Sequence, residues 1–244
     1  MAEAVTEDRL VDGRVRLLQP VDGYRAAIDP VFLAAMVSAG PGERVLDAGC
    51  GAGAATLCLA ARDPECRITG LELDPTRFDL AKRNVALNQV EGRVDLIQGN
   101  IAAPPPRLAP GSFHHVMTNP PHLATGTPPA DVKRAVAHME GAVSLDAWML
   151  ACITLLRPKG ILAVVHRADR LDDLLAALRD RVGDIAVLPL WPMRDRPAKR
   201  ILVRARKGAQ GPTSLLPGLV LHEADGRYTA AADAVLRAGQ GIDF

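Results

Sequence analysis

Four consecutive residues near the middle of the chain, Asn119-Pro120-Pro121-His122, join an amide, two prolines and a flat ring. Neither proline can donate a backbone hydrogen bond, so a helix or an inner strand tolerates the pair poorly. The apolar run before them predicts a strand over 113–119 that ends at this turn. The Asn119 side-chain oxygen and the Pro120 carbonyl could each accept one N–H of an amino group. An amino nitrogen held in this way can turn its lone pair toward an electrophile without a general base.

The role of the ring in this turn has two interpretations. A neutral His122 imidazole could stack on a flat target group, or His122 could be a solvated loop residue. The candidate catalytic residues are Asn119, Pro120, Pro121 and His122.

A second candidate element is the glycine run LDAGCGAG, in which Asp47, Gly49, Gly51 and Gly53 alternate along the chain. Glycines let a ligand approach the backbone closely. Glu72 ends the next predicted strand, where its carboxylate could accept hydrogen bonds from two ribose hydroxyls. A dinucleotide-binding fingerprint would be G-x-G-x-x-G, but the third glycine here comes one residue early. The pattern therefore predicts a pocket for another cofactor that contains a nucleoside.

The D-x-G-x-G-x-G run resembles the first motif of class I methyltransferases, which bind S-adenosyl-L-methionine. The resemblance implies that the glycine loop packs against the methionine end of the cofactor and that Glu72 holds the ribose. Asn100 lies where such enzymes often carry an acid near the adenine amine, and it departs from that pattern. The cofactor-binding residues implied are Asp47, Gly49, Cys50, Gly51, Gly53, Glu72, Leu73, Asn100, Ile101 and Asn119.

The proline turn resembles the N-P-P-aromatic motif of methyltransferases that act on amino groups, although His122 replaces the usual Tyr, Phe or Trp. The layout of the whole chain, including both ends, is similar to the bacterial tRNA (adenine-N6) methyltransferase family that modifies the adenine beside the anticodon of valine tRNA. The resemblance implies N6-methylation of an adenine in RNA, with tRNA as the expected partner. Two alternatives stay open: a protein glutamine-N5 methyltransferase, and an inactive cofactor-binding module that contacts RNA or protein. A nicotinamide-dependent oxidoreductase is a weaker fourth interpretation.

A basic segment near the end of the chain favours RNA as the partner. Residues 194–207 contain seven Lys or Arg residues and one acid, Asp195. Such clusters can neutralise phosphates, although basic residues on an edge strand can also serve only to prevent aggregation. The candidate RNA-binding residues are Arg25, Arg194, Arg196, Lys199 and Arg200.

The alternation of strand and helix patterns predicts an α/β fold, the Rossmann-like class I methyltransferase fold, with helices on both faces of the sheet. Seven strands are predicted, and the last is expected to be antiparallel because its link to the strand before it is short. Besides the strand over 113–119, strands are predicted over 160–167 and from about residue 43. Helices are predicted over 74–88, 145–156 and 170–182, together with one that starts at about Asp29 after a turn and one near the end of the chain. We expect one methyltransferase domain over 1–244, with an N-terminal extension (1–40), a core (41–207) and a C-terminal extension (208–244).

Composition excludes several other classes. The 244 residues carry a net charge of +1, and 48% of them are hydrophobic and 23% charged, as in a globular protein. The polar start is not a signal peptide, and no apolar run is long enough to span a bilayer. The four cysteines form no C-x-x-C pair, which predicts free thiols in the cytoplasm and no metal site. The sequence leaves open whether the chain is a monomer or a weak dimer.

Overall fold

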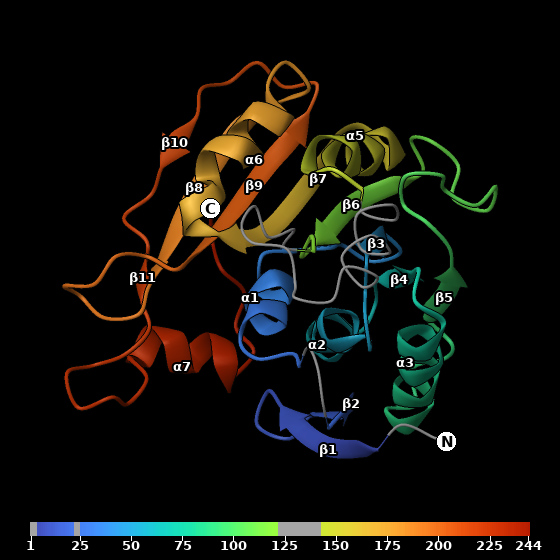
Figure 1. The fold of residues 1–244 in the computed structure, drawn as a ribbon, viewed down its shortest axis with the longest axis horizontal. Coiled ribbons are helices and arrows are strands. Elements are labelled where there is room, and N and C mark those ends of the chain that lie inside the picture. The colour runs from blue at the N-terminus through green and yellow to red at the C-terminus, as the bar shows by residue number, and fades with distance from the viewer. Residues whose placement is uncertain (1–3, 22–24, 122–142) are drawn as a thin grey trace, which may run out of the picture.

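A mixed sheet with helices on both faces forms the centre of the molecule (Figure 1). The computed structural model describes residues 4–21, 25–121 and 143–244. The strand order is β10-β8-β9-β7-β6-β3-β4-β5, and β11 also pairs with β8. The core strands are β3 (Arg44–Ala48), β4 (Arg67–Glu72), β5 (Val94–Gln98), β6 (Phe113–Thr118), β7 (Leu156–Arg167), β8 (Val182–Trp191) and β9 (Arg200–Lys207).

The directions of the strands agree with the predicted fold class. The neighbouring strands β5, β4, β3, β6 and β7 pair in parallel, and β9 is antiparallel to both β7 and β8. The prediction of seven strands is wrong, because the sheet formed by the described residues has nine. The two additional strands, β10 (Ser214–Leu215) and β11 (Leu219–Val220), pair in parallel with β8. They lie in a Pro/Gly-rich stretch, and each is too short to show a strand pattern in the sequence.

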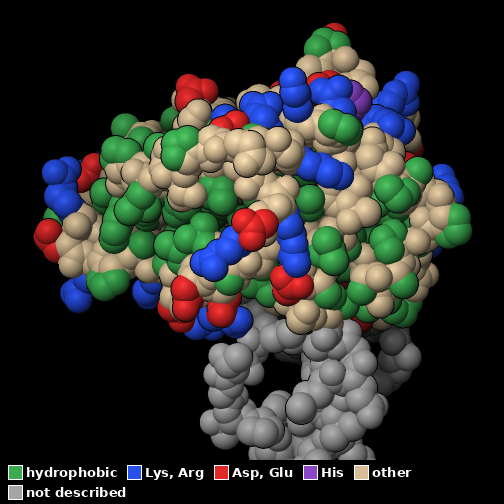
Figure 2. Space-filling model, turned by 90° about the horizontal axis from the view of Figure 1, so that it is seen from above, with side chains coloured by type: hydrophobic (Ala, Val, Ile, Leu, Met, Phe, Trp, Pro, Cys, Tyr) green, Lys and Arg blue, Asp and Glu red, His purple; other side chains and the backbone are tan. Residues whose placement is uncertain are grey.

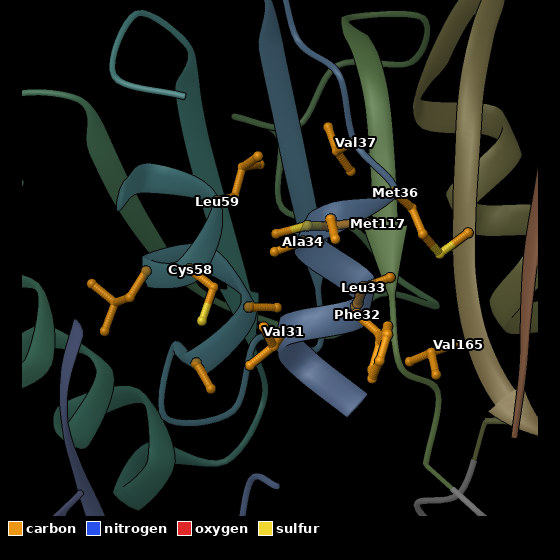
Figure 3. Close-up of a cluster of buried hydrophobic side chains, with 14 of the residues drawn as sticks. Val31, Phe32, Leu33, Ala34, Met36, Val37, Cys58, Leu59, Met117 and Val165 are labelled. Atoms are coloured by element: carbon orange, nitrogen blue, oxygen red, sulfur yellow. The ribbon is translucent and has the colours of Figure 1, made fainter. Parts of the chain in front are cut away.

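The two faces of the sheet bury separate hydrophobic clusters because successive strand residues point to opposite sides. In β3, Val45 belongs to one cluster and Leu46 to the other. Helices α1 (Asp29–Ala35), α2 (Ala54–Arg62) and α3 (Pro75–Leu87) contribute to the first cluster, part of which Figure 3 shows. Helices α5 (Leu145–Leu155) and α6 (Leu171–Leu178) cover the second face (Figure 1).

An antiparallel hairpin of β1 (Val5–Leu10) and β2 (Val15–Pro20) precedes the core, where the sequence predicted only a turn. The hairpin packs against α3 through two asparagine side chains. The Asn84 amide bonds both Leu18 N (2.7 Å) and Leu18 O (2.9 Å), and the Asn88 amide bonds Arg16 N (2.9 Å) and Arg16 O (2.6 Å). Since each amide donates and accepts, α3 hydrogen-bonds β2 much as a neighbouring strand would.

Several predicted boundaries move. Strand β7 begins at Leu156 rather than residue 160, because Leu156 already pairs with Phe113 before a bulge. A 3-10 turn, Ala168–Arg170, precedes α6, and α6 ends at Leu178 rather than residue 182. The predicted C-terminal helix is α7 (Ala230–Leu236).

Both chain ends contact the core. Arg14 in the turn of the hairpin donates to Ala238 O (2.5 Å), just beyond α7. Further along, Ile242 N donates to Ala35 O (2.8 Å) at the end of α1.

No helix within the described ranges combines the length and apolar character needed to cross a membrane. Among the same residues, no group of three or more His, Cys, Asp or Glu side chains is placed to hold a metal ion. All four cysteines are free and buried.

Candidate active site

The candidate cofactor-binding and catalytic residues that the structure describes lie at one edge of the sheet. Strands β5, β4, β3 and β6 are parallel neighbours, so their carboxyl ends meet there. The glycine loop follows β3, and Asn119 follows β6. Ala48 pairs with Thr118 in the last register position of these two strands. The glycine loop and the proline turn therefore start side by side.

The glycine loop is anchored to β4 through its backbone. Gly49 N and Cys50 N both donate to Leu71 O, at 2.8 Å and 2.9 Å. Gly51 has φ +56°, which favours glycine, and a side chain there would meet open space. Burial raises the pKa of the Cys50 thiol, so this cysteine stays protonated within the loop. Gly53 then precedes the first residue of α2.

The carboxylate of Glu72 faces this loop. Its Oε2 accepts from Gly51 N at 2.8 Å, and its Oε1 accepts from Asp74 N at 2.9 Å. Because each carboxylate oxygen has two lone pairs, both can still accept a hydroxyl proton. Glu72 is 7% exposed, and Leu73 beside it is 54% exposed, which offers an apolar surface to a flat ring.

Asp47 supports the loop from inside the fold. Its Oδ2 accepts from the Thr56 hydroxyl at 2.7 Å and from Thr56 N at 3.1 Å, in the first turn of α2. Burial raises the pKa of Asp47 to about 7, and the nearby Glu72 carboxylate adds to the increase, while the bonds from Thr56 oppose it. The contacts of Asp47 thus fix the start of α2. Thr56 was not identified from the sequence.

Asn100 and Ile101 follow β5 at the same edge. The Asn100 side-chain oxygen accepts from Ala102 N at 2.9 Å, and one lone pair of that oxygen is left for an adenine amine. Ile101 is 3% exposed and belongs to the core cluster that α5 covers. The first role of Ile101 is therefore to pack beneath Asn100.

The proline turn continues directly from β6. Asn119 is half-buried, Pro120 is buried and Pro121 is exposed. The side-chain oxygen of Asn119 is buried. His122 lies outside the described residues.

A recess opens beside the prolines. Its walls come from the proline turn, the start of α5, the end of β7 and the 3-10 turn, and its lining is Pro120, Pro121, Val143, Leu145, Trp148, His166 and Arg170. The recess is small, with a cavity volume of about 30 Å³, and it opens to solvent. Sequence reasoning missed Trp148 and His166, because neither belongs to a motif and only the fold brings them here.

The predicted RNA-binding residues fall into two groups. Arg194, Arg196 and Lys199 are exposed on the segment 192–199 between β8 and β9, and none of them makes an ion pair with a described residue. Arg200 Nε instead donates to Asp29 at 2.8 Å. Arg25 donates to Thr6 Oγ1 and Pro20 O at 2.9 Å and 2.7 Å and also pairs with Asp8, within the N-terminal extension.

These residues fit S-adenosylmethionine. Glu72 retains two acceptor lone pairs for a ribose diol, and Leu73 presents an apolar side chain for the adenine. The open space at Gly51 allows an amino-acid group to lie against the loop. Glycine also takes the left-handed backbone conformation at this position without the strain that a side chain would add.

The family model "Methyltransferase small domain" matches residues 28–187. The crystal structure of a predicted O-methyltransferase from Agrobacterium tumefaciens has a TM-score of 0.73 at 23% identity, and covers 88% of this chain and 98% of that one. A geranyl diphosphate methyltransferase in complex with SAM has a TM-score of 0.53 at 16% identity, over 72% and 82% of the two chains. These structures share the class I methyltransferase fold, and the cofactor of the fold is S-adenosylmethionine.

Two relatives carry the same name, tRNA1(Val) (adenine(37)-N6)-methyltransferase. The protein from Aeromonas hydrophila is 30% identical over 219 residues, which are 86% of this chain and 89% of that protein. The protein from Porphyromonas gingivalis is 29% identical over 214 residues, or 84% of each chain. The chain therefore belongs to the methyltransferase small domain family, and within it to the family of bacterial tRNA1(Val) (adenine(37)-N6)-methyltransferases.

Proposed function

We propose that this enzyme methylates N6 of an adenine in tRNA, next to the anticodon of valine tRNA, with S-adenosylmethionine as the methyl donor. The observation that carries the proposal is the placement of the Asn119-Pro120-Pro121 turn beside the glycine loop, at the paired ends of β6 and β3. The names of the relatives from Aeromonas and Porphyromonas support adenine N6 and valine tRNA as the target.

The proline turn positions the target amine. The Asn119 side-chain oxygen and the Pro120 carbonyl each accept one N–H of the adenine amino group, and the two prolines keep that carbonyl aimed. The nitrogen lone pair, otherwise delocalised into the ring, is then directed at the methyl group. S-adenosylmethionine supplies an activated methyl group on a sulfonium. The chain contributes alignment and fixed dipoles, and the proton of the amine leaves after transfer.

Contacts to the cofactor follow from the same edge of the sheet. Glu72 binds the ribose hydroxyls, Leu73 packs on the adenine, and Asn100 accepts from the adenine amine. The glycine loop receives the methionine end, and Asp47 holds that loop through Thr56. His122 stacks on the target base in this proposal.

RNA approaches across the segment 192–199. Strand β8 is antiparallel to β9, as β7 is, so the carboxyl ends of β8 and β7 lie at the same edge. This places Arg194, Arg196 and Lys199 at the edge that bears Asn119. Lys199 O also accepts from Ala168 N (3.1 Å), which ties the segment to the end of β7. Figure 2 shows Lys and Arg side chains in several groups across the face seen there, with Asp and Glu side chains among them.

The substrate also suggests where the enzyme works. A tRNA target places it in the cytoplasm, where tRNA is modified before translation. Either a monomer or a weak dimer is compatible with the proposed chemistry, since every proposed site residue comes from one chain.

The test is methyl transfer from isotopically labelled S-adenosylmethionine to valine tRNA transcribed in vitro. We expect label in N6-methyladenosine after nuclease digestion, and no label when the adenine beside the anticodon is replaced by guanine. Purified release factor serves as the alternative substrate for glutamine methylation. Label in release factor but not in tRNA would overturn the proposal in favour of glutamine-N5 methylation. Cofactor binding without transfer to either substrate would support an inactive module.

A further inference from the structure

Trp148 occupies the position where the glycine loop and the proline turn separate. The β3–β6 ladder ends at Ala48 and Thr118, and beyond it the chain continues to Gly49 on one side and Asn119 on the other. No further pair of the parallel ladder fixes the spacing of these two segments. The first turn of α5, which Ser144 caps through a bond from Ala147 N at 3.2 Å, carries Trp148 to this point.

Two hydrogen bonds connect the indole with both strand ends. Trp148 Nε1 donates to Thr118 Oγ1 at 3.0 Å, and Thr118 Oγ1 donates to Ala48 O at 2.8 Å. Thr118 and Ala48 are both fully buried, at 0% exposure. A bond between buried groups is expensive to lose, because each freed group stays without water. The pair of bonds therefore holds α5 against the ends of β3 and β6.

The six-membered ring of the indole also explains why position 49 is a glycine. A Cβ added at Gly49 would lie 2.9 Å from Cζ2 and 3.0 Å from Cη2 of Trp148. Real Cβ atoms essentially never approach so closely, so any side chain at Gly49 would displace the indole. Gly49 also has φ +76°, a second reason for glycine at this position. Trp148 thus limits how far the glycine loop can move toward α5.

The same side chain lines the recess beside the prolines. Trp148, Leu145 and Pro121 offer apolar surfaces there, and His166 and Arg170 provide polar groups. An apolar recess with a few polar groups suits a flat heteroaromatic ring. Because Pro120 lines this recess as well, a purine at its mouth would lie close to Pro120, whose carbonyl accepts from the target amine in the proposed function.

We propose that Trp148 is a positioning residue for methyl transfer and forms a wall of the pocket that receives the target purine. This inference rests on the proposed function. By filling the space between Gly49 and Thr118, the indole sets the distance from the cofactor loop to the Asn119-Pro120 turn. Methyl transfer needs the two reacting atoms about 3–3.5 Å apart and aligned. A change in this spacing lowers kcat more than it lowers cofactor affinity.

The first experiment compares two substitutions at Thr118, with kcat, KM for tRNA, cofactor affinity and Tm measured for each. Thr118→Ser keeps the hydroxyl relay from Trp148 to Ala48, whereas Thr118→Val keeps the shape and removes the relay. We expect Thr118→Val and Trp148→Phe to lower kcat by about tenfold to a hundredfold. Displacing the reacting atoms by up to about 1 Å has an effect of this size. Thr118→Ser should retain most of the parent kcat. A lower Tm with unchanged kcat in Thr118→Val would overturn the proposal, because the relay would then be only structural.

The second experiment uses Trp148 as its own reporter. The chain has two tryptophans, and Trp191 bonds Pro217 O on the C-terminal extension. In Trp191→Phe, Trp148 is the sole source of indole fluorescence. We expect its emission to change with S-adenosylhomocysteine, and to change again with an anticodon stem-loop that carries the target adenine. The same stem-loop with an abasic site should bind, as fluorescence anisotropy of a labelled RNA will show, and leave the indole emission unaltered.

The outcomes separate this inference from the proposed function. If the parent enzyme methylates tRNA and both Trp148→Phe and Thr118→Val have the same kcat as the parent, this inference is overturned and the proposed function is not. A parent enzyme that never methylates tRNA would overturn the proposed function, and the indole response to S-adenosylhomocysteine would still test the contact with the glycine loop. Equal indole responses to the adenine and abasic stem-loops would overturn the pocket assignment.

Discussion

Asn119 is the residue on which the proposed chemistry depends most directly. It follows Thr118 at the end of β6, and its side-chain oxygen is buried. In Asn119→Ala that acceptor is removed while Glu72 and the glycine loop are unaltered. We expect kcat on tRNA to fall by about a hundredfold or more, as with the loss of one preorganised polar group in other active sites. Cofactor affinity, measured by calorimetry, should stay close to that of the parent.

Asn119→Asp is the matched variant, because it keeps an acceptor of similar size and adds a negative charge. Partial activity is expected, since the carboxylate can still accept a hydrogen bond from the amine. Transfer to tRNA at the parent rate in Asn119→Ala, with cofactor binding intact, would mean that the turn is only a structural corner.

Glu72 permits a second prediction at the same scale. It accepts from Gly51 N at 2.8 Å and from Asp74 N at 2.9 Å, so it shapes the loop as well as the proposed ribose site. In Glu72→Ala we expect the binding free energy of S-adenosylmethionine to weaken by about 1.5–3 kcal/mol, the value of a hydrogen bond to a charged group. Calorimetric titration of the parent and the variant measures this difference.

Glu91→Ala is the control for that titration. Glu91 is exposed and lies before β5, at the edge of the sheet away from the glycine loop. Removing this charge should leave cofactor affinity unchanged, and an equal loss in the two variants would point to net charge rather than to a ribose contact.

Asp47 makes stability depend on pH. Burial raises its pKa from 3.8 to about 7, so between these values the folded chain keeps a proton that the unfolded chain releases. The contribution of Asp47 to the free energy of unfolding is therefore fully present below about pH 4 and is lost as pH rises through about 7. The difference between 3.8 and about 7 corresponds to about 4 kcal/mol.

Asp47→Asn tests this dependence. The amide oxygen can still accept from the Thr56 hydroxyl and from Thr56 N, but it carries no charge. Urea unfolding of both proteins from pH 5 to pH 8 should show the variant gaining stability relative to the parent as pH rises. A constant difference across this range would mean that Asp47 does not titrate within it.

At the scale of elements, α3 links the N-terminal hairpin to the glycine loop. Asn84 is fully buried, and its amide bonds Leu18 N and O and also donates to Ala52 O at 2.9 Å. Asn88, one turn later, bonds Arg16 N and O in the same way and also donates to Asn84 O at 2.8 Å. In Asn84→Ala we expect a loss of about 1–3 kcal/mol of stability for each buried group left unpaired, and weaker cofactor binding because Ala52 lies in the loop.

Asn88→Ala provides the comparison on the same helix. It removes two bonds to β2 near the surface and none to the glycine loop, so cofactor affinity should hold while stability falls by less. If calorimetry gives the same cofactor affinity for Asn84→Ala and the parent, the hairpin does not act on the glycine loop.

The sequence was informative where a strand is buried and an element is regular. Strands β3 and β6 consist almost entirely of buried residues, so their apolar runs were predicted within one or two residues. Strand β1 has the pattern VTEDRL with exposed residues on both sides, and no apolar periodicity marks it. It forms because β2 is held by Asn84 and Asn88, which lie far away in the sequence.

The candidate site was predictable to a similar extent. Asn119, Glu72 and the glycines end strands, and the topological rule for parallel sheets brings them together. Trp148 and Thr118 could not be found in this way, because their contact joins a helix and a strand from separate parts of the chain and belongs to no local pattern. Arg200 looked like its basic neighbours, and only the fold shows that it pairs with Asp29.

At the scale of the whole molecule, the proposed RNA interface depends on local charge rather than on net charge. The net charge is only +1, so long-range attraction to RNA must come from local clusters. Arg194, Arg196 and Lys199 are exposed at that edge. Arg200 differs, since Asp29 is 8% exposed and would be left as a buried, unpaired charge without it. Arg200 therefore has a structural role at the start of α1.

The final prediction separates these roles by salt dependence. Neutralising Arg194, Arg196 and Lys199 together should weaken tRNA binding and reduce the slope of log affinity against log salt concentration. The expected reduction is about 0.7–0.9 for each phosphate that the variant no longer neutralises. Arg200→Ala should instead lower Tm, because Asp29 is largely buried and would lose its charged partner.

A control with the same change of charge lies at the opposite edge of the sheet. Arg44, Arg157 and Lys159 are exposed near the amino ends of β3 and β7, and their neutralisation alters net charge without touching the segment 192–199. Filter binding of valine tRNA between about 50 and 200 mM salt compares the two triple variants. Over this range of salt, a protein that makes about 6–10 phosphate contacts loses affinity by a thousandfold or more. A lower slope only in the variant of the segment 192–199 locates RNA at the catalytic edge. Equal slopes in both variants and the parent would mean that phosphates bind elsewhere, with the N-terminal extension around Arg25 as the next surface to test.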